Sequence, residues 1–323
     1  MSKNIGIDLG TANIVVHVKG QGIVLREPSV IAVEKTSKKI MAIGIEAQQM
    51  VGRTPGNIIA VRPMKDGVIA DFNMAQALLS SFLKRVQSKS KFRKPRILIG
   101  VPCGITEVEK RAVMDATRFA GAKETKLIEE PIAAAVGENI EFDEPTGQMV
   151  VDIGGGTTEV AVLSTGGIVE CQSIRLAGDG FDEAIMAYIR KNHQLLIGER
   201  MAEKIKIEIG SAFPFPTEKE LNVTGRDLVT GLPKTFTIYS SEIRDALTEG
   251  LYTIIEAIRV TLEKTPPELS ADIMDQGILL TGGGSLLHGL DQLINQETNI
   301  KVNRAIDPLS CVALGTAKLL DRL

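Results

Sequence analysis

Two aspartate–glycine turns about half a chain apart constrain this sequence more than any other feature. Residues 8–13 read Asp-Leu-Gly-Thr-Ala-Asn, and residues 152–159 read Asp-Ile-Gly-Gly-Gly-Thr-Thr-Glu. Each turn lies between two short apolar runs, so each predicts a β-hairpin whose first bend carries an aspartate. The match extends further, because residues 19–24 parallel residues 164–169 with one extra residue in the later turn. This repeat predicts two similar α/β lobes that face one ligand.

The chemistry of these turns favours a phosphate ligand. Glycine leaves backbone N–H groups free to approach an anion, with no Cβ in the way. Carboxylates do not bind phosphate directly, so Asp8 and Asp152 imply an intervening cation. Mg²⁺ is the natural candidate because it keeps several waters and takes one or two carboxylates. A single hairpin of this kind is as readily an ordinary glycine turn, but two in register make a shared phosphate site the better interpretation.

Size and composition are those of a globular protein with two domains. The 323 residues are 44% hydrophobic and 24% charged, and the net charge of −3 gives no overall electrostatic footprint for nucleic acid. Cys103, Cys171 and Cys311 are widely spaced and odd in number. We interpret them as buried small residues in a reducing cytoplasm, not as a disulfide or zinc framework.

The sequence also bears on location. No uncharged apolar run approaches the roughly 18 residues that a membrane-spanning helix needs. The chain enters its first predicted strand almost at once, which leaves no room for a signal peptide. We therefore expect a cytoplasmic protein that at most lies on a membrane surface.

Strand and helix patterns alternate along the chain, which predicts an α/β fold. We expect lobe I to span residues 1–138 with a small insertion near 30–71, and lobe II to span 139–323 with an insertion near 180–240. The last helix would return toward lobe I. Expected strands cover residues 29–33, 39–43, 97–101 and 278–280, with a hairpin over 220–239 and a loop-rich stretch over 46–71. Expected helices cover residues 73–87, 106–121, 131–137, 199–209, 242–263, 286–294 and 310–323, with another starting near 182. Residues 106–109, Thr-Glu-Val-Glu, have the capping-box pattern at the start of the second of these helices.

Further motifs accompany the hairpins, at residues 52–57, 62–72, 128–131, 266–269, 280–284 and 307–309. Together they resemble the actin, heat-shock chaperone and sugar-kinase ATPase superfamily, and within it the MreB family, the bacterial actins. The resemblance covers essentially the whole chain. It implies a two-lobed actin-like ATPase fold, with duplicated ribonuclease-H-like domains around a nucleotide cleft.

The resemblance also implies a site for ATP or ADP with Mg²⁺. Asp8 and Asp152 would orient the metal through its waters, and Glu130 would position the attacking water with help from Thr157. The β- and γ-phosphates would be held by Gly10, Thr11, Ala12 and Asn13 from one lobe and by Gly154, Gly155, Gly156 and Thr157 from the other. Considered without the family, Glu130 is more readily a helix N-terminal acid that complements the helix dipole.

The nucleoside would lie against a charged helix. Glu199, Glu203 and Lys206 fall on one side of it, a pattern that is usually a solvated face. The resemblance instead implies contacts to ribose and adenine from Glu203, Lys204, Ile205 and Lys206, and closure over the base by Gly282, Gly283, Gly284 and Ser285. The choice of adenine over guanine comes from the resemblance alone.

The segment 84–96 holds seven basic residues, no acid and one aromatic, Phe92. Such runs are usually solvated, but this one is also typical of a contact with anionic lipid. The family has a hydrophobic membrane loop in this region, whereas this sequence has one clear apolar residue there and no amphipathic N-terminal extension. We expect weak membrane contact by Lys89, Lys91, Phe92, Arg93 and Lys94, strengthened by avidity along a filament.

In function, the resemblance implies an ATP-dependent cytoskeletal filament with slow Mg-dependent ATPase activity. The polymer would lie beneath the cell membrane and guide wall synthesis in rod-shaped cells, with the chain itself, an anionic membrane and cell-wall elongation proteins such as RodZ, MreC and MreD as partners. A chaperone is not expected, because the last predicted helix closes the ATPase and leaves no peptide-binding domain. A small-molecule kinase of the same superfamily stays open as the alternative.

Overall fold

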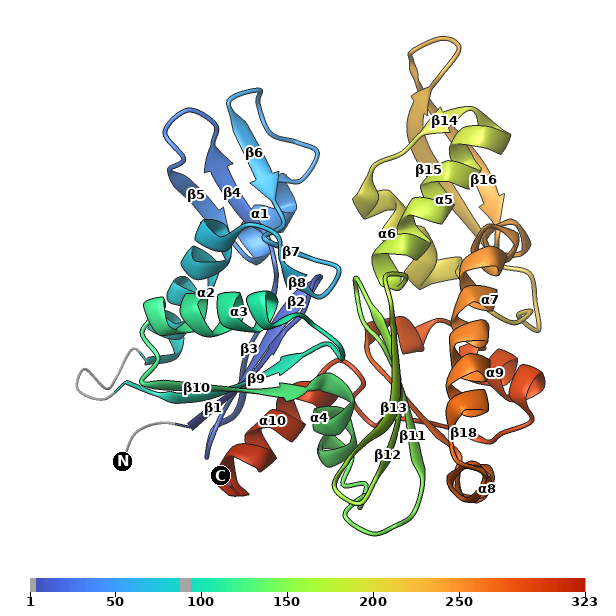
Figure 1. The fold of residues 1–323 in the computed structure, drawn as a ribbon. Coiled ribbons are helices and arrows are strands. Elements are labelled where there is room, and N and C mark those ends of the chain that lie inside the picture. Colours follow the sequence, from blue (N-terminus) through green and yellow to red (C-terminus); the bar gives the residue numbers. More distant parts are fainter. Residues whose placement is uncertain (1–3, 88–93, 323) are drawn as a thin grey trace.

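The computed structural model describes residues 4–87 and 94–322. It is built around two five-stranded sheets, which define lobe I and lobe II (Figure 1). The lobe I sheet has the strand order β10-β9-β1-β2-β3, and its strands are β1 (Asn4–Leu9), β2 (Asn13–Val18), β3 (Gly22–Pro28), β9 (Arg96–Val101) and β10 (Glu124–Glu129).

The lobe II sheet repeats this topology. Its order is β13-β12-β11-β17-β18, and its strands are β11 (Gln148–Ile153), β12 (Thr158–Ser164), β13 (Gly167–Ile174), β17 (Ile278–Thr281) and β18 (Val302–Arg304). In each sheet three consecutive strands form an antiparallel meander, and two later strands add in parallel beside the first. Both aspartate–glycine turns therefore join the first two strands of a sheet, and the predicted α/β duplication is confirmed.

The core of lobe I lies between its sheet and two helices, α2 (Phe72–Gln87) and α3 (Glu107–Phe119). Ile5, Ile7 and Ile99 of the sheet belong to one buried cluster with Leu78 and Phe82 of α2. The predicted capping box at the start of α3 is present, because Thr106 and Glu109 satisfy each other's backbone N–H groups.

A small sheet fills the insertion of lobe I. It contains β4 (Ile31–Glu34), β5 (Ile40–Ile43) and β6 (Ile58–Val61), with α1 (Ile45–Met50) beside it and the short pair β7 (Met64–Lys65) and β8 (Val68–Ile69) after it. The prediction of a loop-rich stretch was wrong for α1 and β6. Turn residues surround both elements, and β6 becomes a strand because it pairs with β4, which is distant in sequence.

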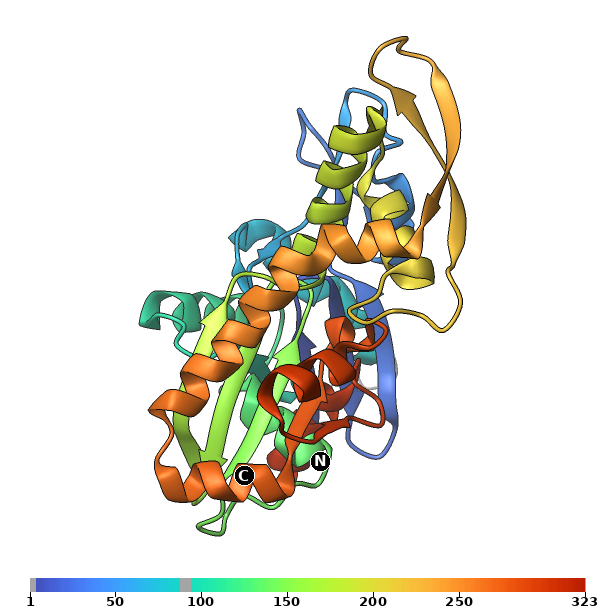
Figure 2. The same ribbon diagram turned by 90° about the vertical axis from the view of Figure 1, so that its right-hand side faces the viewer.

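Lobe II is larger because its insertion carries a helical layer and a hairpin. The additional elements are α5 (Gly178–His193), β14 (Leu195–Leu196), α6 (Glu199–Ile209), β15 (Glu220–Asp227), β16 (Pro233–Tyr239), α7 (Ser240–Lys264) and α8 (Pro267–Gln276). The long α7 starts directly after β16 and runs from the β15–β16 hairpin across the strands of the lobe II sheet (Figure 2). Apolar side chains of α5, α6 and α7 enter the main core of this lobe.

One predicted helix begins later than expected. Instead of a helix over 286–294, a 3₁₀ turn η1 (Gly283–Leu286) comes first and α9 (Leu290–Thr298) follows. Gly289 separates them with a φ of 70°, where a Cβ would also lie 2.3 Å from the Cβ of Phe213. The position therefore needs glycine, and the backbone cannot run straight into an α-helix there.

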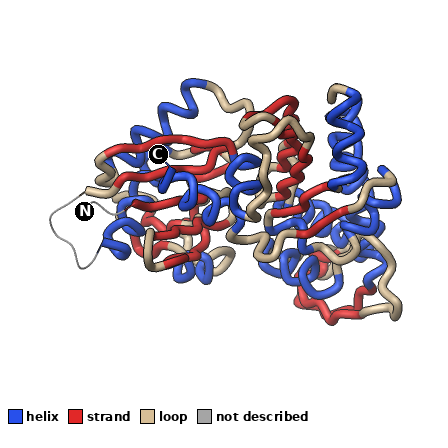
Figure 3. The backbone as a smooth tube through the Cα atoms, turned by 90° about the horizontal axis from the view of Figure 1, so that it is seen from below, coloured by secondary structure: helices blue, strands red, loops and turns tan. Residues whose placement is uncertain are grey.

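Two helices connect the lobes. α4 (Glu130–Gly137) buries alanines against Val150 and Ala161 of the lobe II sheet. α10 (Cys311–Arg322) crosses α4 and also lies against β1, since a Cβ on Gly6 would be 2.5 Å from Thr316 Oγ1. Both helices lie between the two sheets (Figure 1), and helices flank the strands of both lobes when seen from below (Figure 3). None of the helices within the described ranges is suited, by length and apolar character, to span a bilayer.

Candidate functional site

A cavity of about 520 Å³ lies between the lobes, where the two hairpins meet. Residues of both lobes line it. The predicted residues in the lining are Asp8, Gly10, Thr11, Ala12, Asn13 and Glu130 from the first part of the chain, and Asp152, Gly154, Gly155, Gly156, Thr157, Glu203, Lys206, Gly282, Gly283 and Gly284 from the second. The structure thus brings together residues that are up to 276 positions apart (8 to 284).

The hairpins touch each other directly. A Cβ on Gly155 would lie 2.6 Å from the Cβ of Ala12, and a Cβ on Gly156 would lie 2.6 Å from Thr11 Oγ1. Thr11 Oγ1 also accepts a hydrogen bond of 2.9 Å from the Gly67 N–H. Any larger residue at these glycines would separate the turns, so glycine keeps the two backbones close together beside one cavity. Glycine-rich turns of this kind suit a phosphate chain, because their backbone N–H groups can approach the anion.

Three carboxyl groups line the same space. Burial raises the pKa of Asp8 to about 7. Burial, followed by the charges of Asp8 and Glu159, raises the pKa of Asp152 to about 8. Burial and the charges of Asp8 and Asp152 raise the pKa of Glu130 well above its usual range. Removed from water and close to one another, these carboxylates favour a bound cation that would relieve their repulsion.

The donor set fits Mg²⁺. Asp8 on β1 of lobe I and Asp152 on β11 of lobe II supply hard carboxylate oxygens, and the glycine turns that follow them line the same cavity. Mg²⁺ prefers oxygen ligands, keeps part of its water shell, and in phosphate sites is held by one or two carboxylates. The cavity therefore offers the small number of carboxylates that such an ion needs.

The lobe II end of the cavity is polar and partly paired. Lys206 Nζ donates to Asp182 Oδ2 at 2.9 Å and to the Gly178 carbonyl at 2.7 Å. Glu203 lies beside it in the lining. Within the described part of the chain, the buried Oδ1 of Asp182 has no hydrogen-bond partner, which leaves an acceptor for a ligand donor.

Three predicted contacts lie outside the lining. Lys204 is exposed and pairs at 3.8 Å with Glu208, which does line the cavity, whereas Ile205 is completely buried in the lobe II core. Ser285 is buried too, and its hydroxyl donates to the Gly282 carbonyl. Each belongs to a turn or helix that forms the cavity, but its own side chain does not reach the surface of the cavity.

Several lining residues were not predicted from the sequence. Arg62 of lobe I reaches across to Glu199 at 3.2 Å and to Asp179 at 3.7 Å, both in lobe II. Phe215 stacks on His288 with ring centroids 4.0 Å apart, and both residues line the cavity. Arg62 belongs to the motif at residues 62–72 that resembles the MreB family, so the sequence contained an indication that this residue is functional. No local pattern pointed to the aromatic pair.

The predicted membrane contact is mostly untested. Lys89, Lys91, Phe92 and Arg93 lie outside the described residues, and Lys94 is exposed.

Comparisons with known proteins agree with this geometry. The family described as "MreB/Mbl protein" matches residues 2–323. The chain is 54% identical to the cell shape-determining protein Mbl of Bacillus cereus, over 100% of this chain and 97% of that protein. It is also 54% identical to the cell shape-determining protein MreB of Escherichia coli, over 100% and 94%. The crystal structure of MreB5 of Spiroplasma citri bound to ADP superposes with a TM-score of 0.95 at 39% identity, covering 100% of this chain and 97% of that one. The chain therefore belongs to the MreB/Mbl family, and its fold is that of the bacterial actins.

Proposed function

We propose that this chain binds ATP or ADP with Mg²⁺ between its lobes and uses the nucleotide to control a cytoskeletal filament that maintains rod cell shape. The observation that carries the proposal is the pair of matched hairpins that meet in one cavity. Two findings support it: relatives of similar length are named cell shape-determining proteins, and a structure with the same fold is described as bound to ADP.

Both hairpins contribute to holding the phosphates. Backbone N–H groups of residues 10–13 and 155–157 would donate to phosphate oxygens, with hydroxyl donors from Thr11 and Thr157. The Gly154 N–H instead donates to the Thr157 carbonyl at 2.9 Å within its own turn. Hydrogen bonds to an anion are about twice as strong as neutral ones. Mg²⁺, when bound by Asp8 and Asp152 through water, supplies the positive charge that offsets charge developing during phosphoryl transfer. The stacked Phe215 and His288, with the unpaired oxygen of Asp182, would face the nucleoside.

Glu130 has the position and the chemistry to act on a water molecule. It opens α4 at the end of β10 and lines the cavity together with Asp8, Asp152 and Thr157. Its raised pKa makes it a stronger proton acceptor than an ordinary carboxylate once it is ionised. Thr157 would hold the same water through its hydroxyl.

Nucleotide occupancy would set the angle between the lobes. A ligand that contacts both hairpins would bind the closed arrangement of the lobes more tightly than an open one. The difference between these two binding free energies would shift the protein toward the closed arrangement. Arg62 already reaches from lobe I to Glu199 and Asp179 of lobe II beside the cavity. A closed subunit would then assemble head to tail, the kind of contact that generates open polymers.

Sedimentation of the purified full chain tests the proposal. With ATP and Mg²⁺ the chain should pellet as filaments visible by electron microscopy, and without nucleotide it should stay in the supernatant. Glu130→Gln should still bind ATP and assemble, but phosphate release should fall about 100-fold because general-base catalysis is lost. Glu141→Gln, at an exposed loop position, is the matched control.

Two results would count against this function. Equal pelleting with and without nucleotide would show that filament formation does not depend on the cavity. ATP-dependent phosphate transfer to a small hydroxyl compound, without assembly, would favour a kinase of the same superfamily.

The filament would lie at the inner face of the cell membrane, with the cell-wall elongation proteins RodZ, MreC and MreD as partners. The basic segment 84–96 supports this location, since each basic residue near an anionic surface contributes about 1 kcal/mol. Replacing Lys89, Lys91, Arg93 and Lys94 by glutamine should abolish co-flotation with anionic liposomes at low salt. The same change at the exposed Lys191 and Lys301 of lobe II should not. Undiminished flotation of the first variant would place the membrane contact elsewhere.

A further inference from the structure

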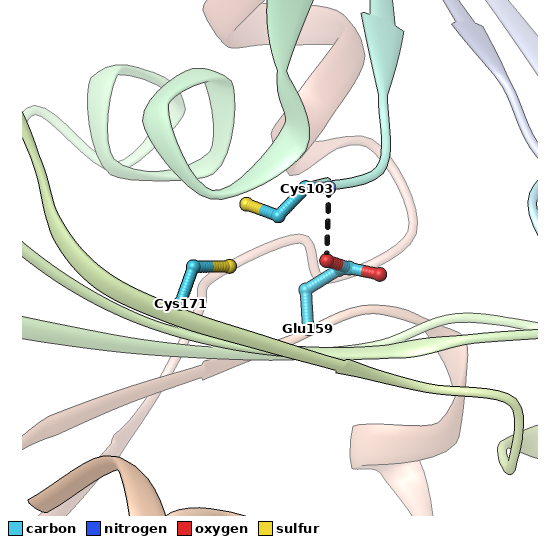
Figure 4. Close-up of side chains that lie close together, drawn as sticks. All are labelled: Cys103, Glu159 and Cys171. Atoms are coloured by element: carbon cyan, nitrogen blue, oxygen red, sulfur yellow. Dashed lines mark hydrogen bonds between the residues drawn. The ribbon is translucent and has the colours of Figure 1, made fainter. Parts of the chain in front are cut away.

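A second cluster of reactive side chains lies between the lobes, outside the nucleotide cavity. Cys103 follows β9 in lobe I, whereas Glu159 is on β12 and Cys171 on β13 of lobe II. Figure 4 shows the two sulfur atoms turned toward each other, with the Glu159 carboxylate beside the Cys103 backbone. The chain brings them together from positions 56 and 12 residues apart (103 to 159, 159 to 171).

The three donor atoms are close enough to share one ion. The sulfur atoms and one carboxylate oxygen all lie within 4.8 Å of one another. Two sulfurs and an oxygen bound to one tetrahedral Zn²⁺, at ordinary bond lengths of roughly 2.0–2.3 Å, are separated by less than about 4 Å. Small rotations of two cysteine side chains are therefore sufficient to complete such a set.

Glu159 is already held in place by neighbouring donors. The Cys103 N–H donates to its Oε2 at 3.0 Å, and the Ser173 hydroxyl donates to its Oε1 at 2.6 Å. Each carboxylate oxygen keeps a lone pair after accepting these bonds. Metal-binding carboxylates are typically oriented by hydrogen bonds of this kind.

Burial makes the cluster unusual for a purely structural contact. Glu159 is 1% exposed and Cys103 is 7% exposed, yet within the described residues no lysine or arginine hydrogen-bonds or forms an ion pair with Glu159. Burial raises the pKa of Glu159, and the contact with Cys171, followed by burial, raises the pKa of Cys103. A cation is the partner that a buried carboxylate and two thiols lack.

We propose that Cys103, Glu159 and Cys171 bind a thiophilic divalent cation, Zn²⁺ by preference, and that this ion ties lobe I to lobe II. Two thiolates select zinc over magnesium or calcium, which prefer oxygen ligands. Three protein ligands leave the fourth tetrahedral position for water.

The site lies behind the phosphate-binding turn. Glu159 is two residues after Thr157 on the same hairpin, and Pro102, next to Cys103, lies against the Gly67 turn that contacts Thr157. An ion that joins the Cys103 loop to β12 and β13 would restrict movement between the lobes on this side. Zinc occupancy would therefore reduce the range of lobe angles available to the protein.

Zinc binding by the full chain, without nucleotide or magnesium, tests the proposal independently of the proposed function. Competition with a chromophoric chelator should give one zinc per chain, with about two protons released from the thiols at neutral pH. The cobalt-substituted protein should show thiolate-to-cobalt charge-transfer absorption. Zinc should also raise the midpoint of thermal unfolding, because it binds only the folded arrangement.

Substitutions assign the ligands. Cys103→Ser and Cys171→Ser should each weaken zinc binding at least about 100-fold and remove the charge-transfer band. Ser173→Ala should weaken it about 10-fold, the lower end of the effect of losing an outer-shell partner. Cys311→Ser is the matched control, since this buried thiol donates to the Ala134 carbonyl and is absent from the cluster.

Two outcomes would overturn the proposal. One is zinc affinity that is the same in the wild type, Cys103→Ser and Cys171→Ser. The other is a wild-type cobalt spectrum without a thiolate band, which does not depend on any variant folding correctly. The expected results in both measurements would establish the site.

Discussion

At the scale of single residues, the carboxyl groups of the cavity are the most informative. Asp8, Asp152 and Glu130 line the same cavity and are partly or fully buried, and within the described residues none of them forms an ion pair with a lysine or arginine. Buried like charges are costly unless they are protonated or neutralised by a cation. Their arrangement therefore opposes folding when no cation is bound and favours the binding of Mg²⁺ and nucleotide.

This cost predicts a pH dependence of stability. The pKa values of Asp8 and Asp152 are about 7 and about 8 in the folded chain, above those of unfolded aspartate. Between about pH 4 and pH 8 the folded chain keeps protons that the unfolded chain has released. The free energy of unfolding without ligand should therefore fall as pH rises, by up to about 1.4 kcal/mol per pH unit for each group. Urea unfolding at several pH values measures this slope.

Asp152→Asn should flatten that slope, because the amide does not ionise. Asp227→Asn is the control, since hydrogen bonds from Thr230 and other neighbours lower the pKa of Asp227 to about 2, outside this pH window. Magnesium should oppose the fall, because it binds the ionised carboxylates, and nucleotide should add to this effect by binding the magnesium. If the free energy of unfolding depends on pH identically in Asp152→Asn and the wild type, ionisation of Asp152 does not destabilise the folded chain.

At the scale of elements, the two hairpins act as one unit although they belong to different lobes. Their turns are in contact at Gly155 and Ala12, and at Gly156 and Thr11. The contact is possible because two backbones meet where one of them has no side chain. The distance between the lobes at the phosphates is therefore set by these turns.

Gly155→Ala should weaken nucleotide binding by about tenfold or more, equivalent to about 1.4 kcal/mol. The added methyl group would lie 2.6 Å from Ala12 Cβ and 3.0 Å from its nitrogen, so the turns must separate and the amides no longer converge on one anion. Titration with a fluorescent nucleotide measures the change. Gly167→Ala is the control, because a Cβ in that neighbouring turn meets no atom within 4 Å. Equal affinities in both variants would refute the role of the contact.

At the scale of the whole molecule, the crossing of α4 and α10 joins the lobes. A Cβ on Gly315 would lie 1.7 Å from the Ala133 carbonyl oxygen, and a Cβ on Gly137 would lie 2.2 Å from the Cys311 carbonyl oxygen. Glycine on each helix therefore faces backbone of the other. Alanines on α4 continue the close approach against the lobe II sheet. Any change in the angle between the lobes must pass through this tight crossing.

Gly315→Ala should therefore destabilise the protein by about 2 kcal/mol, within the range found when a packed interior is overfilled. Gly56→Ala, at an exposed position with open space around it, should change stability by less than about 0.5 kcal/mol. Thermal or denaturant unfolding of both variants measures these changes in the free energy of unfolding. A Gly315→Ala protein as stable as the wild type would mean that the helices can separate without cost.

Much of the fold and of the candidate site was predictable because the relevant signals are local. The apolar–turn–apolar pattern predicted both hairpins, and the periodicity of residues 199–209 predicted α6 with its observed bounds. The capping box at Thr106 was correct for the same reason. The repeat of Asp8 and Asp152 in two similar contexts predicted that both would line one cavity, and they do.

Other features were decided only by tertiary structure. β6 is a strand because β4 offers it a partner. α9 starts late because Gly289, which packs against Phe213, has a φ of 70° that an α-helix does not adopt. Ile205 precedes a lining position on α6 but points into the lobe II core, since a helix turns each side chain by about 100° from the last. Cys103 and Cys171 carried no spacing signal, because two different lobes supply them to the cluster with Glu159.

The amino-acid sequence by itself determined the local units of this protein: the acidic glycine turns, the amphipathic helices and their caps. These depend on bond rotations and hydrogen bonds within a few residues of each other. Only the tertiary structure decided which units meet across the lobes, how the buried acids shift one another's pKa values, and where two distant thiols join a carboxylate. Such properties depend on distances through space and on exclusion of water, which exist only once the two lobes have packed around α4 and α10.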